Sequence, residues 1–229
     1  MKEPSLQHPF GTDVFGRDIL SRIFFAFRYD LLMAISILVM VVPIGTVIGL
    51  IAGYYQGSLI DTVLMRITDI FLAIPSIVLA LAICAMLEPS LFNSMMAISV
   101  LWWPWYSRLA YGIARSLKNE YFVQAAELTG ASTPHILFRE ILPNCLSPIF
   151  TKMTLDVGWV ILIGSTLSFV GLGAQEPIPA LGSMVAVGTK YMPDYWWMTI
   201  FPAIAIAFTI LGFNLLGDGL RDMLAVEEV

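Results

Sequence analysis

Aspartates are the residues of this chain whose type could support hydrolytic chemistry in an apolar protein. Tyr29-Asp30 and Gly217-Asp218 each place a carboxylate beside a long apolar run. Acid–base hydrolysis by two carboxylates requires both groups to share one site, where one is protonated and the other ionised. Both aspartates instead fall at the ends of predicted membrane spans, and Leu215 stands where a Gly-x-Gly-Asp pattern requires glycine. The sequence therefore argues against an intramembrane protease.

Patterns for nucleotide hydrolysis, for other hydrolases and for metal binding are missing from the sequence as well. Gly188-Thr189-Lys190 has neither the order nor the spacing of Gly-x-x-x-x-Gly-Lys-Ser/Thr, the loop that holds nucleotide phosphates. No Gly-x-Ser-x-Gly or His-Glu-x-x-His pattern occurs. Cys84 and Cys145 have no Cys-x-x-Cys spacing, which argues against a zinc site or a disulfide framework. We therefore expect a chain that is not an enzyme and that binds no metal or cofactor itself.

Composition indicates the class of protein. Apolar residues make up 58% of the 229 residues and charged residues 13%, whereas soluble domains average about a half and about a quarter. The net charge is −5 and the basic residues form no dense cluster, so nucleic acid is not an expected partner. We predict an all-α polytopic membrane protein, with a single transmembrane domain over residues 1–229 and about five spans. The predicted spans are Leu31–Tyr55, Ile67–Leu87, Ser94–Arg115, Leu146–Leu172 and Thr199–Gly217.

Three glycines in the first predicted span recur at every fourth residue. Gly45, Gly49 and Gly53 follow Pro43 and form a double small-xxx-small pattern. Such a pattern lets another helix backbone approach closely, and close packing matters where lipid supplies no hydrophobic drive for helix association. We predict a helix-packing face at these glycines, with contact to a substrate as the alternative.

Aromatic and acidic residues lie unusually deep in two predicted spans. Trp102 and Trp105 belong to an aromatic run in the middle of the third span, although aromatic belts belong at the membrane interface. They line either a helix contact, which we predict, or a substrate path. Asp156 lies a turn or two inside the fourth span, where a charged group costs about 2.5–3.5 kcal/mol at the centre and less near an end. Its roles are gating or pathway lining, or a solvated or paired structural one with Lys152 as the candidate partner.

The stretch Tyr121–Asn144 is the longest central segment without a membrane-length apolar run. Its first part contains helix formers, with Tyr121, Ala125 and Leu128 on one face. Gly130 stands where a left-handed cap would end that helix. The pattern therefore predicts a short helix followed by a sharp break.

A second helix is predicted directly after that break. Ser132 or Thr133 can cap its first turn, and Pro134 fits its first position, where the missing N–H costs nothing. The helix should stop before Pro143, because a residue that precedes proline is pushed out of the helical region. On spacing alone, the stretch is either a plain amphipathic hairpin or a docking element for another protein.

The same stretch resembles the cytoplasmic coupling loop, or EAA motif, of bacterial ABC importer permeases. That motif consists of Glu-Ala-Ala, three residues, Gly, nine residues, Ile, one residue and Leu-Pro. Gln124 replaces the first Glu and Glu140 replaces the Ile. The residues in register are Ala125, Ala126, Gly130, Leu142 and Pro143. The resemblance implies that these residues, together with Tyr121, Gln124 and Glu127, contact ATPase subunits and couple ATP hydrolysis to transport.

Two further segments resemble the dipeptide, oligopeptide and nickel permeases of the same family. HPFGTDVFGRD (residues 8–18) is similar to the segment before the second membrane helix of that subfamily, and LSFVGLG (residues 167–173) is similar to another of its signatures. The tail LGDGLRDML resembles its ending, although AVEEV departs from it. The resemblance implies uptake of peptides or a related solute such as nickel. It also implies a second permease subunit, two ATP-binding subunits that use ATP and magnesium, and an extracytoplasmic solute-binding protein.

Orientation follows from the predicted spans. With residues 117–145 in the cytoplasm and residues 1–28 as an extracytoplasmic or interfacial lead-in, seven of the 12 basic residues lie inside, which favours this topology. The inside residues would be Arg66, Arg108, Arg115, Lys118, Arg139, Lys152 and Arg221. We expect a multi-pass protein of a bacterial or archaeal cell membrane that lacks the helix that related permeases carry before residues 8–13. A secondary transporter or channel is the alternative class, but it predicts internal repeats and midplane charges, and only Asp156 comes close.

Overall fold

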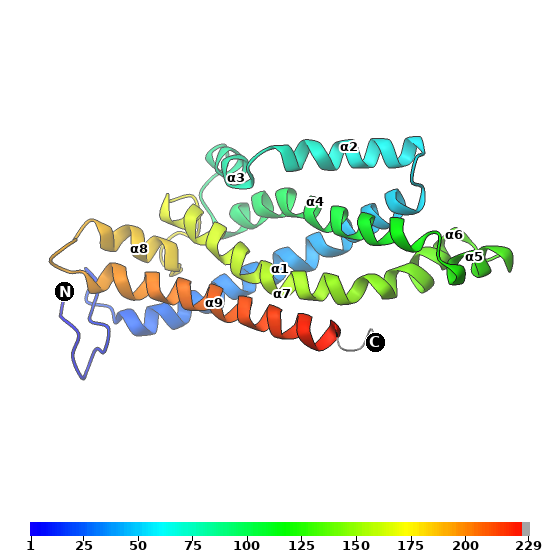
Figure 1. Cartoon of the computed structure of the whole chain (residues 1–229). Coiled ribbons are helices and arrows are strands. Elements are labelled where there is room, and N and C mark those ends of the chain that lie inside the picture. Colours follow the sequence, from blue (N-terminus) through cyan, green and yellow to red (C-terminus); the bar gives the residue numbers. More distant parts are fainter. Residues whose placement is uncertain (226–229) are drawn as a thin grey trace. The chain divides into compact units, whose positions relative to one another are not determined.

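The structure is a computed structural model that describes residues 1–225, and every regular element in that range is a helix (Figure 1). The last four residues of the AVEEV tail lie outside the described residues. The elements in chain order are α1 (Ile19–Tyr54), α2 (Leu59–Ala73), α3 (Ser76–Ala85), α4 (Leu91–Leu117), α5 (Tyr121–Leu128), α6 (Thr133–His135), the π-helix η1 (Ile136–Ile141), α7 (Leu142–Phe169), α8 (Leu181–Thr189) and α9 (Trp197–Ala225). The predicted all-α fold class is therefore confirmed.

The chain divides into two compact units, and each is described by itself. The first unit comprises Met1–Ile37, Ile77–Ile98 and Leu155–Leu216. The second comprises Leu38–Ser76, Ser99–Thr154 and the chain from Gly217. Each of the long helices α1, α4, α7 and α9 contributes to both units.

Helix lengths bear on the predicted spans. Within residues 1–225, three continuous helices are long and apolar enough to cross a membrane: α1, the run Thr133–Phe169, and α9. The pair α2 and α3 makes a fourth if it is one broken span. The third predicted span lies in α4, which has 27 residues but is not apolar enough to belong to this group.

Three boundaries differ from the predicted spans. Residues 19–28 of the predicted lead-in belong to α1, which runs without interruption from Ile19 to Tyr54. Pro75 interrupts the second predicted span, because it lies between α2 and α3, where Ile74 is extended at ψ 129°. A residue before proline is displaced from helical geometry. The chain before that span is also helical from Leu59, with Ser58 as the N-cap.

The core of the first unit joins the start of α1 to α8 and α9. It contains seven buried residues: Ile19, Ile23, Ala26, Leu181, Met184, Trp197 and Met198. The N-terminal segment packs on this core, where the rings of Phe10 and Phe201 stack with centroids 4.1 Å apart. Asp30 on α1 is also buried, and its carboxylate lies close to the Leu181 N–H at the start of α8.

The second unit is built on contacts of α4 with α1 and α2. Arg108 of α4 forms an ion pair with Asp69 of α2. One turn away, the Trp103 ring meets Phe71 of α2 edge to face, with centroids 5.6 Å apart. These contacts hold α2 beside α4, and α4 leads directly into the hairpin of α5 and α6.

Candidate functional site

The turn that ends α5 is a Schellman motif. The Gly130 N–H donates to the Glu127 carbonyl and the Ala131 N–H donates to the Ala126 carbonyl, both at 3.0 Å. These bonds satisfy carbonyl groups that the end of a helix leaves open. Gly130 has a φ of +81°, a left-handed conformation that residues with a Cβ rarely adopt. Glycine at position 130 therefore sets the direction in which the chain leaves α5.

The helix that follows the turn runs without a break from Thr133 to Phe169. Pro134 is its second residue rather than its first, with Ser132 at the N-cap position. The expectation that this helix stops before Pro143 is wrong, because Pro143 is the second residue of α7. The π-helix η1 precedes it, and wider π turns pair residues five apart rather than four. A proline in an α-helix clashes with the carbonyl four residues before it and donates no hydrogen bond to it. We infer that the wider turns of η1 accommodate the Pro143 ring, so that the helix continues.

The outer face of α5 is apolar and exposed. Tyr121 is 87% exposed and Leu128 89%, and Ala125 between them is also exposed. These three residues share one helical face, as the sequence predicts. Val123, on the opposite side, is fully buried and holds the helix against the rest of the second unit. Two large apolar side chains left uncovered on one short helix form a surface that a partner protein could bury.

The other residues of the motif take local roles. The Gln124 side chain donates to the Asn119 carbonyl at 3.0 Å, across the turn between α4 and α5. Ala126 is half-buried, Leu142 is half-buried and Pro143 is exposed. Glu140, the second departure from the motif, lies 3.5 Å from the His135 ring. Both departures from the motif therefore have partners nearby in the sequence, five residues away in each case.

Tyr54 is a residue of this site that sequence reasoning missed. It ends α1, and its hydroxyl donates to Glu127 of α5 at 2.8 Å. The sequence carries no signal for this bond, because an aromatic residue at the end of a span is also typical of a plain interface anchor.

The three glycines of α1 lie against α4 within the second unit. A Cβ at Gly53 would lie 2.8 Å from the Tyr111 carbonyl oxygen and from Ala114. Gly45 and Gly49 approach the α4 backbone still more closely. Any side chain at these positions would force the helices apart, so the glycines form a packing face in this structure.

The aromatic and acidic residues that lie deep in two predicted spans differ in their exposure. Trp102 is buried, whereas Trp105 is 46% exposed. The Lys152 ammonium lies 5.7 Å from the Trp105 ring centroid and 5.4 Å from that of Tyr106, within the range of a cation–π contact. Asp156 is buried rather than solvated. Of these residues, Trp105 and its contact Lys152 therefore lie at the surface of their unit.

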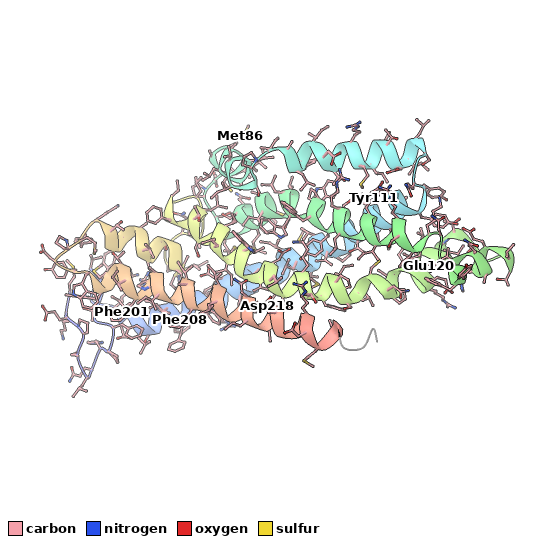
Figure 2. The ribbon with its side chains drawn as sticks, in the orientation of Figure 1. Met86, Tyr111, Glu120, Phe201, Phe208 and Asp218 are labelled. Carbon is pink, nitrogen blue, oxygen red and sulfur yellow. The ribbon has the colours of Figure 1, made fainter. Side chains whose placement is uncertain are left out.

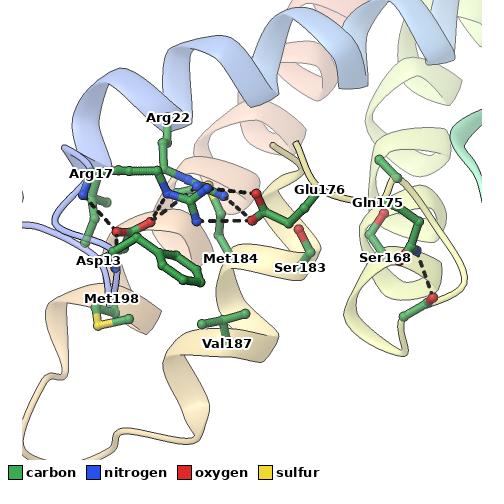
Figure 3. A pocket seen from close by; sticks show the side chains of 14 residues that line it. Asp13, Arg17, Arg22, Ser168, Gln175, Glu176, Ser183, Met184, Val187 and Met198 are labelled. Carbon is green, nitrogen blue, oxygen red and sulfur yellow. Dashed lines mark hydrogen bonds and ion pairs between the residues drawn. The ribbon is translucent and has the colours of Figure 1, made fainter. Parts of the chain in front are cut away.

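A closed network of charges lies in the first unit, between the HPFGTD segment and the loop that follows α7 (Figure 3). The Arg17 guanidinium donates to Glu176 through two nitrogens, at 2.8 and 3.1 Å, and to Asp13 at 2.7 Å. Arg22 is paired with the same two carboxylates, at 3.1 Å for Glu176 and 3.3 Å for Asp13. Two cations and two anions therefore satisfy one another.

The electrostatics of this charge network follow from its pairing. Hydrogen bonds from Arg17, opposed by desolvation and assisted by Arg22, hold the pKa of the Glu176 carboxyl below its ordinary value of 4.5. The same contact with Glu176 raises the pKa of Arg17. Asp13 is nearly buried and also accepts from the N–H groups of Phe15 and Arg17, both at 2.9 Å. Glu176 is therefore ionised and Arg17 protonated near neutral pH.

A cavity of about 140 Å³ lies beside this charge network. Its wall combines Ser168 and Gln175 with apolar side chains of α8 and α9, among them Met184, Val187 and Met198 (Figure 3). The Gln175 amide is bonded to the carbonyls of its own loop, at 2.9 and 3.1 Å. The cavity wall thus presents mostly satisfied polar groups.

Comparison with known proteins places the chain in a family. Residues 45–226 match the model of the "binding-protein-dependent transport system inner membrane component". The chain is 45% identical over 221 residues to the probable D,D-dipeptide transport system permease protein DdpC of Escherichia coli, covering 96% of this chain and 74% of that protein. It is 44% identical to the dipeptide transport system permease protein DppC of Alkalihalophilus pseudofirmus, over 98% and 73% of the two chains.

A solved structure supports the fold class. A chain of the MetNI methionine ABC transporter, in an inward-facing conformation, superposes with a TM-score of 0.70 at 16% identity, covering 90% of this chain and 97% of that one. The glutathione transport system permease protein GsiD of Pectobacterium atrosepticum is 41% identical over 96% of this chain and 73% of that protein. The chain therefore belongs to the family of binding-protein-dependent transport system inner membrane components, the permeases of ABC importers.

Proposed function

We propose that this permease takes up short peptides and is driven by ATPase subunits that dock on the hairpin of α5 and α6. The peptide assignment is supported by the names of its relatives, which include dipeptide and D,D-dipeptide permeases. The docking assignment is supported by one observation above all: Tyr121 and Leu128 leave an apolar face uncovered on a helix that matches the EAA motif.

Docking on this face requires a groove in the ATPase that accepts a short helix. Ala125 separates the two large side chains and lets the helix backbone approach its partner closely. The rigid turn at Gly130 and the buried Val123 hold α5 in one orientation. A force applied to α5 would therefore displace the rest of the second unit and would not bend the hairpin. Closure of the ATPases around ATP and magnesium would then switch the permease between two packed states, which coupling requires.

The remaining partners follow from the same assignment. A second permease subunit completes the pathway in a bacterial or archaeal cell membrane, and an extracytoplasmic binding protein delivers the solute. This chain binds no ATP itself and supplies no catalytic residue.

Reconstitution of the importer tests the proposal. The chain is co-expressed with its second permease, its ATPases and its binding protein, purified as a complex and placed in liposomes. ATP-dependent uptake of radiolabelled dialanine is the expected result. Uptake of nickel in place of dialanine would overturn the peptide assignment, and uptake without any ATPase would overturn the docking assignment.

A further inference from the structure

We propose that Tyr54 is the positioning residue through which the coupling helix α5 moves α1. The inference rests on the proposed docking of ATPases at α5 and adds a specific link between that helix and the first span. It concerns one hydroxyl group and the carboxylate that accepts its hydrogen bond.

Tyr54 stands where several segments of the second unit meet. Its hydroxyl donates to the Glu127 Oε1 at 2.8 Å, and Thr133, the first residue of α6, lies near that hydroxyl. The Lys118 ammonium, just beyond α4, lies 5.7 Å from the centroid of the Tyr54 ring. Tyr55 packs on the same ring edge to face at 5.2 Å. One side chain at the end of α1 therefore contacts both helices of the hairpin and the segment that leads into it.

The bond to Glu127 differs from the Gln124 bond of α5 in the separation of its two partners along the sequence. Gln124 bonds the carbonyl of Asn119, five residues away, and so stiffens the turn locally. Glu127 bonds Tyr54, 73 residues away in the sequence and at the end of a 36-residue helix. A displacement of α5 is therefore transmitted to α1 through Glu127, whereas Gln124 keeps α5 attached to α4.

The chemistry of this bond suits a mechanical link. A phenol that donates to a carboxylate forms a charge-assisted hydrogen bond, which is roughly twice as strong as a neutral one. The tyrosine side chain has few rotatable bonds, and Thr133, Tyr55 and Lys118 surround it in this structure. Glu127 itself lies on the side of α5 that carries this bond, so docking of a partner on Tyr121 and Leu128 leaves the bond in place.

The test measures coupling in the reconstituted importer. Tyr54→Phe removes the hydroxyl and keeps the ring. We expect ATP hydrolysis and recovery of the complex to stay close to the wild type, while dialanine uptake per ATP hydrolysed falls about fivefold or more. The binding protein should stimulate ATP hydrolysis through the same bond, from α1 to α5. This stimulation should therefore fall in Tyr54→Phe as well.

Matched variants separate this link from a general loss of structure. Tyr55→Phe removes the neighbouring hydroxyl and should leave uptake per ATP unchanged. Glu127→Ala breaks the same bond from the α5 side and should match Tyr54→Phe, whereas Glu127→Gln keeps an acceptor oxygen and should restore most of the coupling. The double variant Tyr54→Phe, Glu127→Ala should be no worse than either single change, because both remove one interaction.

Each outcome decides the point. Normal uptake per ATP in Tyr54→Phe, or additive losses in the double variant, would overturn the link and leave the docking proposal intact. Failure of the docking proposal has a different signature: changes on the Tyr121 and Leu128 face would then leave ATPase recovery unaltered. If Tyr54→Phe is not recovered in the complex, the comparison of Glu127→Ala with Glu127→Gln decides the question without changing α1.

Discussion

The hairpin of the second unit and the charge network of the first unit differ in how far their side chains are partnered within the chain. In the charge network, Asp13, Arg17, Arg22 and Glu176 are paired with one another, and Asp13 is nearly buried. In the hairpin, α5 exposes large apolar side chains and contacts the rest of its unit through Val123, the bond of Gln124 to Asn119 and the bond of Glu127 to Tyr54. Charged groups that pair with one another fix the conformation of their region. An exposed apolar face on a helix is instead available for burial by a partner protein.

The surface of the first unit sharpens this contrast. Phe208 projects from α9 (Figure 2), is 68% exposed, and lies with Phe27 and Gly212 beside a shallow open groove. An exposed apolar side chain on a membrane-length helix needs no partner protein, because lipid can cover it. The exposed residues of α5 belong to a helix of eight residues, which is too short to span a bilayer. The same exposure therefore has different meanings on the two helices.

The largest expected effect comes from breaking the turn of the hairpin. Gly130→Val places a β-branched residue at a φ of +81°, where even an unbranched L-residue costs about 1–2 kcal/mol. We expect normal membrane insertion but uptake near background, measured in the reconstituted importer. Gly130→Asn is the matched control, because asparagine tolerates this conformation and should retain much of the activity. Full uptake by the valine variant would show that the turn is not required.

The next effect concerns the exposed face of α5. Leu128→Gln should lower the amount of ATPase that co-purifies with the permease about tenfold, since burial of a leucine side chain contributes roughly 1.5–3 kcal/mol. Leu6→Gln is the control, because Leu6 is also fully exposed but lies in the first unit. Equal recovery of ATPase with both variants would contradict docking at α5.

A smaller effect is expected from the charge network. Arg22→Gln leaves Asp13 and Glu176 with one cation between them, and the Arg22 side chain is only 14% exposed. We expect a loss of about 1–2 kcal/mol, discounted for the exposure of Glu176, and hence a thermal midpoint several degrees lower. Recovery of ATPase should be unchanged. A drop in ATPase recovery without any loss of stability would reverse the assignment of the two regions.

The smallest effect is the pH dependence of Glu176. Its pKa is depressed in the folded protein, so its stabilising contribution is present above its ordinary pKa of 4.5 and is lost as the pH falls through the lower folded value. The thermal midpoint of the wild type should exceed that of Glu176→Gln near neutral pH. The two midpoints should converge as the pH falls below 4.5 and through the lower folded pKa of Glu176. A constant difference at all pH values would mean that the charge of Glu176 contributes nothing.

Local features of the hairpin were predictable because they depend on neighbouring residues. The helix formers after Tyr121 and the glycine at 130 indicate a short helix and its end, and α5 occupies Tyr121–Leu128. The continuation through Pro143 was not predictable, because the choice between a break and a π-helical widening depends on surrounding packing. Pro75 shows the opposite outcome for the same type of residue, since the chain breaks there.

The sequence by itself determined that this is an all-helical membrane permease, because composition, apolar run lengths and motif spacing are properties of contiguous residues. It also placed the glycines of α1 at the spacing needed for close packing. Only the tertiary structure decided that α4 is the helix they meet, that Tyr54 bonds Glu127, and that Arg17 and Arg22 share Glu176 across more than 150 residues. Such pairings are set by which helix faces come together, and the order of residues along one helix does not specify its neighbour.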